Sequence, residues 1–191
     1  MNVDKIILGQ LGKPNEVGIY AAANLFVTPW YFIATAVIGS FAPKLIKFHQ
    51  TDFNAYVALV SKISRHFGIL VISIASIVTI FADSIVSEFY GPIYSQVGQV
   101  LSINIWAVVF VLQVSFRGRL LIIEGSQIYV AKLVFLGTLT NIILNLYLIP
   151  VNGAIGAAYA YTISWAMSAL IYPFLFEKTR SHVLLFIGMK R

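Results

Sequence analysis

Charged residues divide this chain into long apolar segments. Residues 133–176 include no Asp, Glu, Lys or Arg, and residues 17–43 include none either. An apolar helix needs about 20 residues to cross the hydrocarbon core of a membrane. The 44-residue run therefore predicts two crossings, and Pro150 and Gly153 predict a tight turn between them.

Two shorter apolar segments, residues 63–86 and 98–116, predict further helices that cross the membrane. The first 12 residues are apolar after Lys5 but too short to cross, so they predict a partial helix. The chain is thus predicted to be an all-α integral membrane protein, a single six-helix transmembrane lobe with a truncated first helix and five full spans. The predicted spans in residues 1–191 are roughly 1–12 (partial), 17–43, 63–86, 98–116, 128–149 and 154–176.

The connections between these spans differ in their basic residues. Residues 44–65, polar at first and then amphipathic, form one predicted connection, and residues 83–96 form a predicted loop. Lys and Arg favour the cytoplasmic side of short loops, so we expect the C-terminus in the cytoplasm and the partial first helix to begin there. Alternate connections and the tail hold 11 of the 13 basic residues: Lys44, Lys47, Lys62, Arg65, Arg117, Arg119, Lys132, Lys178, Arg180, Lys190 and Arg191.

The composition supports a membrane protein and argues against several other classes. The chain is 59% apolar and 10% charged, with a mean hydropathy of +0.87, whereas soluble domains are about 25% charged. Its net charge of +6 is spread between the spans, so no nucleic-acid partner is predicted. Cysteine is absent, which excludes disulfides and thiolate metal sites. The first residues do not resemble a signal peptide, and we expect the spans themselves to direct insertion.

No set of residues typical of catalysis or cofactor binding stands out. His49, His66 and His182 are isolated near polar boundaries, and we expect surface residues there rather than metal ligands. Gly153 and Gly156 open an apolar helix and do not follow a strand, so they predict no phosphate loop. The chain is therefore expected to be neither an enzyme nor dependent on a cofactor.

Asp4 and Arg117 are charged residues at or near predicted membrane segments. Asp4 is interpreted either as a solvated residue at a cytoplasmic helix start or as a carboxylate that couples transport to an ion or a proton. Arg117 closes the 98–116 span. We expect its side chain to extend to the cytoplasmic interface, and the alternative is a cavity position where it pairs with a phosphate.

Asn141 and Asn145 stand four residues apart and so share one face of a predicted helix. Amide side chains within lipid form hydrogen bonds across helices, so helix packing is the favoured interpretation and substrate binding the alternative. Small residues in the next helix would allow another helix to approach closely. Aromatic residues fit a belt at the membrane interface: Trp30, Tyr31, Tyr90, Tyr94 and Tyr172.

Three segments together resemble the polysaccharide flippases of the multidrug/oligosaccharidyl-lipid/polysaccharide exporter superfamily. The first runs from Asp4 through Gly9, Gly12, Gly18 and Tyr20 to Ala22, and the second contains Tyr90, Gly91, Pro92, Tyr94, Leu101, Ile103 and Trp106. The third is the sequence Asn141-x-x-Leu144-Asn145-x-x-Leu148-Ile149-Pro150-x-x-Gly153-Ala154-x-Gly156. The order and spacing of the three segments carry the resemblance, which covers nearly the whole chain.

This resemblance implies a twelve-helix protein of two lobes with a central cavity, of which this chain resembles the C-terminal lobe. Such proteins move an undecaprenyl-diphosphate-linked oligosaccharide across the bacterial inner membrane by alternating access. The implied partners are the lipid bilayer, the lipid-linked oligosaccharide, and either an N-terminal lobe or a second copy; a polysaccharide polymerase and glycosyltransferases are further candidates. Candidate transport-path residues are Asp4, Arg117, Asn141 and Asn145.

Two other functions remain open at this point. One is a multidrug or cation exporter of the same superfamily, although few carboxylates lie in the predicted spans. The other is a truncated membrane scaffold that does not transport and that assembles with polysaccharide enzymes.

Overall fold

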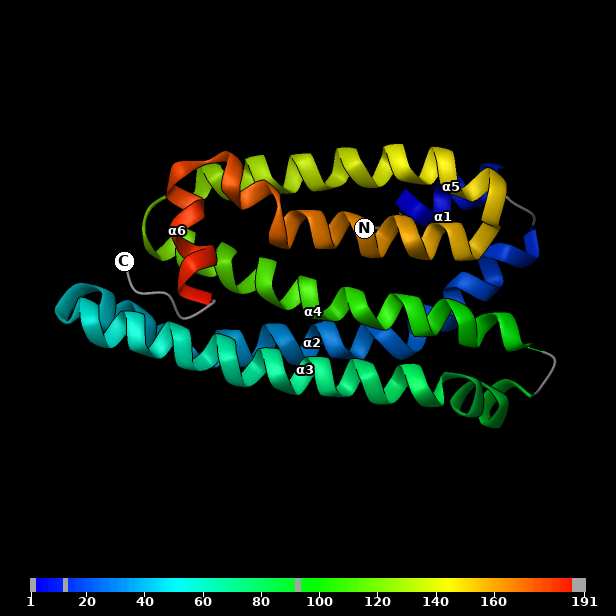
Figure 1. The fold of residues 1–191 in the computed structure, drawn as a ribbon, viewed down its shortest axis with the longest axis horizontal. Helices are drawn as coiled ribbons and strands as arrows, with labels where there is room; N and C mark the ends of the chain where they lie inside the picture. The colour runs from blue at the N-terminus through cyan, green and yellow to red at the C-terminus, as the bar shows by residue number, and fades with distance from the viewer. Residues whose placement is uncertain (1–2, 12–13, 92–93, 187–191) are drawn as a thin grey trace.

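The chain folds into an elongated bundle of long helices that lie side by side (Figure 1). The computed structural model describes residues 3–11, 14–91 and 94–186, and within these ranges it has helices and turns but no strand. The all-α prediction is therefore confirmed. The helices are α1 (Val3–Leu11), α2 (Pro14–Thr51), α3 (Phe53–Tyr90), α4 (Ser95–Ile123), α5 (Gln127–Leu170), the 3-10 helix η2 (Tyr172–Leu175) and α6 (Glu177–Phe186).

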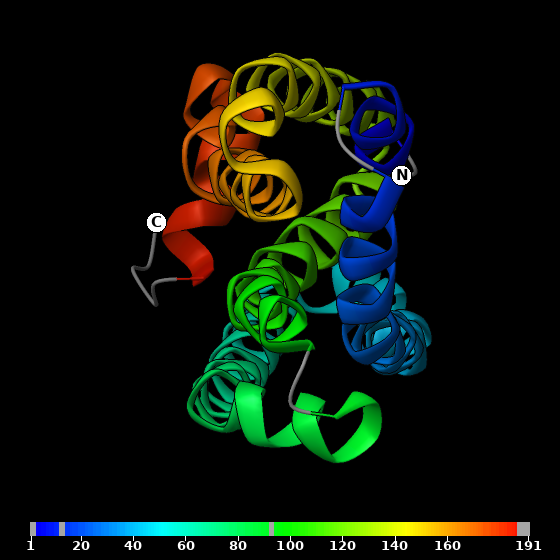
Figure 2. The same cartoon turned by 90° about the vertical axis from the view of Figure 1, so that its right-hand side faces the viewer.

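Four helices in the described ranges are long and apolar enough to cross a membrane: α2, α3, α4 and α5, the last counted together with η2. These helices differ in how much of their apolar surface the bundle covers, and the uncovered apolar surface suits contact with lipid. In α4, 61% of the most apolar stretch is buried within the bundle, whereas the other three helices bury only 12–17%. Figure 2 shows α4 lying between α5 on one side and α2 and α3 on the other. The number of crossings and the side of the C-terminus stay predictions.

Helix α5 doubles back on itself, as Figure 1 shows. Gly153 has a φ of 53° and a ψ of −129°, a backbone conformation that a side chain would strain. Gly156 packs so closely on the Leu148 carbonyl that a Cβ there would collide with it. The reversal lies where the sequence predicts it, and the Ala154 N–H after the turn donates a hydrogen bond of 2.7 Å to Glu16 Oε2.

Residues 44–65, predicted to connect two spans and to be amphipathic in their later part, are helical at every position except Asp52, where the chain passes from α2 to α3. Only Asp52 interrupts α2 and α3, and its side chain caps α3 by accepting a hydrogen bond of 3.0 Å from the Ala55 N–H. The helices persist because they bury apolar side chains against the end of α4. This second core cluster includes Leu45, Tyr56, Val60, Ile63, Phe116 and Leu120.

The predicted loop at residues 83–96 is also shorter than expected. Helix α3 runs to Tyr90 and ends at Gly91, whose φ is 88°, and α4 begins at Ser95. Charged and hydroxyl residues suggested a loop here, but Val86 is buried in the main core and keeps this part of α3 helical. That core gathers around α4 and joins α1, α2, α3 and residues on both sides of the α5 turn.

Candidate functional site

A buried carboxylate lies where α1 meets α2 and α5. Asp4 is only 2% exposed. The Tyr20 hydroxyl of α2 donates a hydrogen bond of 3.4 Å to Asp4 Oδ2, and the Asn145 side-chain amide of α5 donates one of 2.8 Å to Oδ1. Both of these partners are neutral, so neither compensates the charge of the carboxylate with a charge of its own.

The hydrogen bonds continue from Asp4 into both arms of α5. The Asn145 amide also donates to Asn141 Oδ1 at 3.1 Å, and the Asn141 amide donates to Ser164 Oγ at 3.4 Å. Asn141, Asn145 and Ser164 are all buried. We call Asp4, Tyr20, Asn141, Asn145 and Ser164 the Asp4 network. It connects α1 and α2 to the two antiparallel arms of the α5 hairpin.

The local sequence explains why these groups meet. Asn141 and Asn145 are one helical turn apart, so both face the same neighbours. The second arm of α5 is rich in small buried residues, and small residues allow helices to approach closely. Asp4 lies in the first turn of α1, where the helix dipole favours a negative charge. The small buried residues of the second arm are Ala154, Gly156, Ala157, Ala158, Ala160, Ser164, Ser168 and Ala169.

A pocket of about 50 Å³ lies beside the Asp4 network, between the two arms of α5 and α4. This volume admits a small number of water molecules, and the lining is mostly apolar with a few polar groups. In addition, Asn145 Oδ1 is buried with no hydrogen-bond partner among the described residues. The pocket is lined by Val114, Leu133, Val134, Gly137, Thr138, Asn141, Tyr161, Ser164, Trp165 and Ser168.

The chemistry available here is the uptake of a proton or a small cation. A charged carboxylate that is buried among neutral donors is costly in free energy, and binding a proton or a cation removes that cost. Amide side chains can turn by 180° and then offer oxygen in place of nitrogen, so Asn145 can adapt to either protonation state of Asp4.

Arg117 lies apart from the Asp4 network and is only 1% exposed. Its Nη1 donates to the Ser168 carbonyl at 3.2 Å and its Nη2 to the Ala169 carbonyl at 2.8 Å. A cation at the carbonyl end of a helix is favoured by the helix dipole. Arg117 therefore fastens the end of the second α5 arm to α4.

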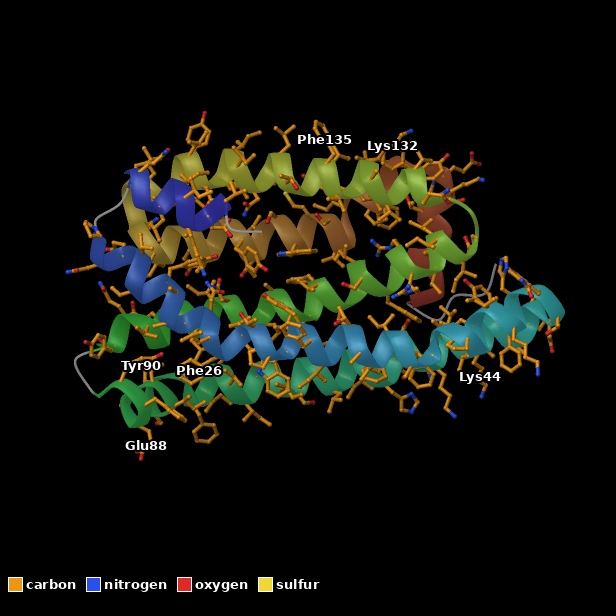
Figure 3. All side chains as sticks on the ribbon, turned by 180° about the vertical axis from the view of Figure 1, so that it is seen from behind. Phe26, Lys44, Glu88, Tyr90, Lys132 and Phe135 are labelled. Carbon is orange, nitrogen blue, oxygen red and sulfur yellow. The ribbon has the colours of Figure 1, made fainter. Side chains whose placement is uncertain are left out.

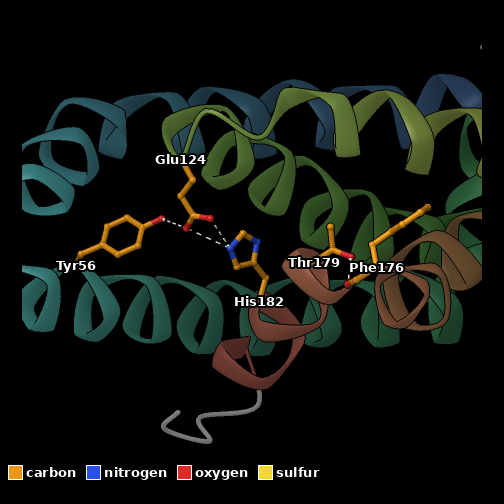
Figure 4. Close-up of polar contacts among 5 residues, drawn as sticks. All are labelled: Tyr56, Glu124, Phe176, Thr179 and His182. Carbon is orange, nitrogen blue, oxygen red and sulfur yellow. Dashed lines mark hydrogen bonds and ion pairs between the residues drawn. The ribbon is translucent and has the colours of Figure 1, made fainter.

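A second buried polar cluster joins α3, the α4–α5 turn and α6 (Figure 4). Glu124 accepts a hydrogen bond of 3.1 Å from the Tyr56 hydroxyl, and His182 Nε2 lies 2.9 Å from Glu124 Oε2. Burial alone would raise the pKa of Glu124, but the hydrogen bond and charge of His182, together with the Tyr56 hydroxyl, hold that pKa below its ordinary value. This cluster holds α6 on the bundle.

Comparison with known proteins finds two relatives of note. The chain is 27% identical over 173 residues to the probable flippase AglR of Haloferax volcanii, covering 88% of this chain and 36% of the relative. It is 22% identical over 177 residues to the capsular polysaccharide biosynthesis protein CapF of Staphylococcus aureus, covering 92% of this chain and 45% of the relative. The chain thus spans less than half the length of both. No family model and no solved structure gives a significant match.

The structure brings together three of the four candidate residues, Asp4, Asn141 and Asn145, and leaves Arg117 outside the group. The interpretation of Asp4 as a solvated residue is wrong, because Asp4 is buried. The expectation that Arg117 extends to the interface is wrong for the same reason. Whether any of the four lies on a transport path stays a prediction.

Sequence reasoning missed His182, which it placed on the surface but which is only 3% exposed. Thr179 and Val183 are buried with it. Their spacing of three and four positions places all three residues on one helix face, and this spacing is the clue that the sequence offers. His49 is half-buried and His66 is exposed. In the described part of the chain, no group of three or more His, Asp or Glu residues could hold a metal ion.

Proposed function

We propose that the chain takes part in translocating an undecaprenyl-diphosphate-linked oligosaccharide across a bacterial inner membrane. The observation that carries this proposal is the similarity, over about nine-tenths of the chain, to a probable flippase and a capsular polysaccharide biosynthesis protein. Four membrane-compatible helices support it, because a lipid-linked substrate must be handled within the bilayer. The proposed role is transport rather than catalysis.

The proposed working unit is larger than these 191 residues. The chain matches 36% and 45% of the two relatives, a share that suits one of two lobes. A transporter site commonly lies between two repeats that move against each other. We therefore propose that this chain forms the second lobe and that another lobe, or a second copy, completes the cavity.

The proposed role of the Asp4 network is to couple uptake of a proton or cation to movement of the α5 hairpin. Asp4 contacts Asn145 on the first arm, and Asn141 contacts Ser164 on the second arm. A change of charge at Asp4 thus alters hydrogen bonds that hold both arms and border the pocket. Buried ionisable groups of this kind mark ion and proton relays in membrane proteins.

The second candidate function is export of a cationic drug, which the same buried carboxylate favours. A cation could displace the neutral partners of Asp4 and pair with the carboxylate directly. Resistance to toxic cations in cells that produce the protein would support this function over flipping.

A deletion strain tests the proposed function. Loss of the gene should abolish surface polysaccharide and accumulate lipid-linked oligosaccharide on the cytoplasmic side, and the wild-type gene should restore both. A polymerase or glycosyltransferase partner would be detected by cross-linking in the strain to which the wild-type gene has been restored. Normal surface polysaccharide in the deletion strain, where no second flippase is encoded, would refute the proposal.

A further inference from the structure

Exposed charge is segregated between the two ends of the bundle. Figure 3 shows Lys44 and Lys132 toward one end and Glu88 at the other. At the end of Glu88, Asp83 is also exposed. The end of Lys44 is strongly basic, and its exposed acidic residues in the described chain are Asp52 and Glu177. Its exposed basic residues are Lys44, Lys47, Lys62, Arg65, Arg119, Lys132, Lys178 and Arg180.

Four of these basic residues lie at or near the end of a long stretch without Asp, Glu, Lys or Arg. Lys44 directly follows the uncharged residues 17–43 of α2, and Lys132 directly precedes the uncharged run that forms most of α5. Arg65 precedes the apolar part of α3, and Arg119 is the exposed arginine at the end of the apolar part of α4. Each of the four long helices thus contributes one cation at or near the end of its uncharged, apolar part. We call these four residues the boundary cations.

The boundary cations are not neutralised by the protein itself. Within the described ranges, none of the four forms an ion pair with a carboxylate. Two of them are held in place by aromatic rings: Lys44 Nζ lies 5.6 Å from the centre of the Phe48 ring, and Lys132 Nζ lies 5.3 Å from Tyr129. Such contacts orient an ammonium group and leave its N–H donors free for an anion.

We propose that the boundary cations bind the phosphate groups of anionic phospholipids in the leaflet that they face. An anionic membrane surface attracts each nearby Lys or Arg strongly enough to change the affinity about fivefold. The four cations lie at the ends of apolar helix segments, so they are expected at the depth of the lipid headgroups. A phosphate at that depth in a membrane belongs to a lipid. This proposal does not depend on flippase activity, so either proposal can fail without the other.

Thermal unfolding of the purified full chain in dodecyl maltoside tests the proposal. Phosphatidylglycerol, phosphatidylcholine and inorganic phosphate would each be titrated, and native mass spectrometry would count bound lipids. Phosphatidylglycerol should raise the unfolding midpoint in a saturable manner, and phosphatidylcholine should not, because binding to the folded state alone stabilises it. An equal effect of phosphatidylcholine, or a full effect of inorganic phosphate, would overturn the proposal.

Two variants with the same net charge separate the boundary cations from basic charge in general. The first carries Lys44→Gln, Arg65→Gln, Arg119→Gln and Lys132→Gln, and the control carries Lys47→Gln, Lys62→Gln, Lys178→Gln and Arg180→Gln. The first should bind phosphatidylglycerol at least about tenfold more weakly than wild type, and the control should lose clearly less affinity than the first. Equal losses in the two variants would contradict the proposal.

Single substitutions and a charge-conserving double variant guard against misfolding. Should the fourfold boundary variant fail to fold, single substitutions are measured instead, each with an expected loss of about fivefold. A variant with Lys44→Arg and Lys132→Arg keeps the charge and should bind like wild type. Loss of phosphatidylglycerol binding in that variant, or no loss in any single variant, would refute the proposal.

Discussion

The side-chain amide of Asn145 donates a hydrogen bond of 2.8 Å to the buried carboxylate of Asp4, although the two residues are 141 positions apart in the sequence. This contact brings the first described helix of the chain against the hairpin at the other end of the chain. It also gives Asp4 a neutral partner rather than a cation. The same contact therefore holds α1 against α5 and involves the carboxylate that we propose takes up a proton or a cation.

Replacing Gly156 with alanine should destabilise the α5 hairpin. An added Cβ would collide with the Leu148 carbonyl on the first arm of α5. Such overpacking costs about 1–3 kcal/mol. Gly39→Ala is the matched control, because nothing lies within 4 Å of a Cβ there. It should stabilise the protein by about 0.5–1 kcal/mol, since alanine is the better helix former. Denaturation in detergent micelles measures both, and equal effects would refute the close packing.

Replacing Arg117 with methionine should destabilise the protein by about 2–4 kcal/mol. The substitution leaves the Ser168 and Ala169 carbonyls without their guanidinium donors. Arg119→Met offers a control two positions away, and because Arg119 is exposed its effect should stay within about 0.5 kcal/mol. Similar unfolding midpoints for the two variants would show that the buried hydrogen bonds of Arg117 contribute little to stability.

The Glu124 cluster should make stability depend on pH. The pKa of Glu124 is lower in the folded protein than its ordinary value, so its contribution is present above pH about 4.3 and disappears as the pH falls through the folded value. Glu124→Gln should therefore be less stable than wild type at pH 7, by about 1–2 kcal/mol. The difference should shrink in acid, where both side chains are neutral.

Unfolding midpoints of wild type and Glu124→Gln between pH 7 and pH 3.5 provide the check. Glu88→Gln serves as the control, because Glu88 is exposed at the opposite end. A difference between Glu124→Gln and wild type that stays constant over this pH range would contradict the expected role of the Glu124 carboxylate.

Apolar patterning predicted the helices and the hairpin because a long uncharged, apolar run suits a helix that crosses a membrane, whichever of its faces packs inside the bundle. The turn at Gly153 follows from the local sequence, and so does the shared face of Asn141 and Asn145. The amphipathic pattern in residues 44–65 indicates helix there, but it does not show where the chain turns or which helix covers the apolar face. Burial against Phe116 and Leu120 of a distant helix decides the structure of this segment.

The environment of the charged residues was the least predictable part. The burial of Asp4 depends on Tyr20 and Asn145, which come from two other helices. The burial of Arg117 and His182 likewise depends on partners from distant segments. A charged residue between apolar spans gives the same local pattern whether it faces water or a partner, so only the tertiary structure separates the two.

Translocation of a labelled undecaprenyl-diphosphate oligosaccharide in proteoliposomes tests the central claim most directly. The assembled transporter, in which the proposed other lobe or a second copy completes this chain, should accelerate translocation. Asp4→Asn should slow it at least about fivefold, the lower end of ordinary coupling energies, without lowering the unfolding midpoint. Asp52→Asn, the same change at an exposed helix cap that asparagine also suits, should leave the rate unchanged. No translocation by the wild-type protein, or equal rates for wild type and Asp4→Asn, would contradict the account.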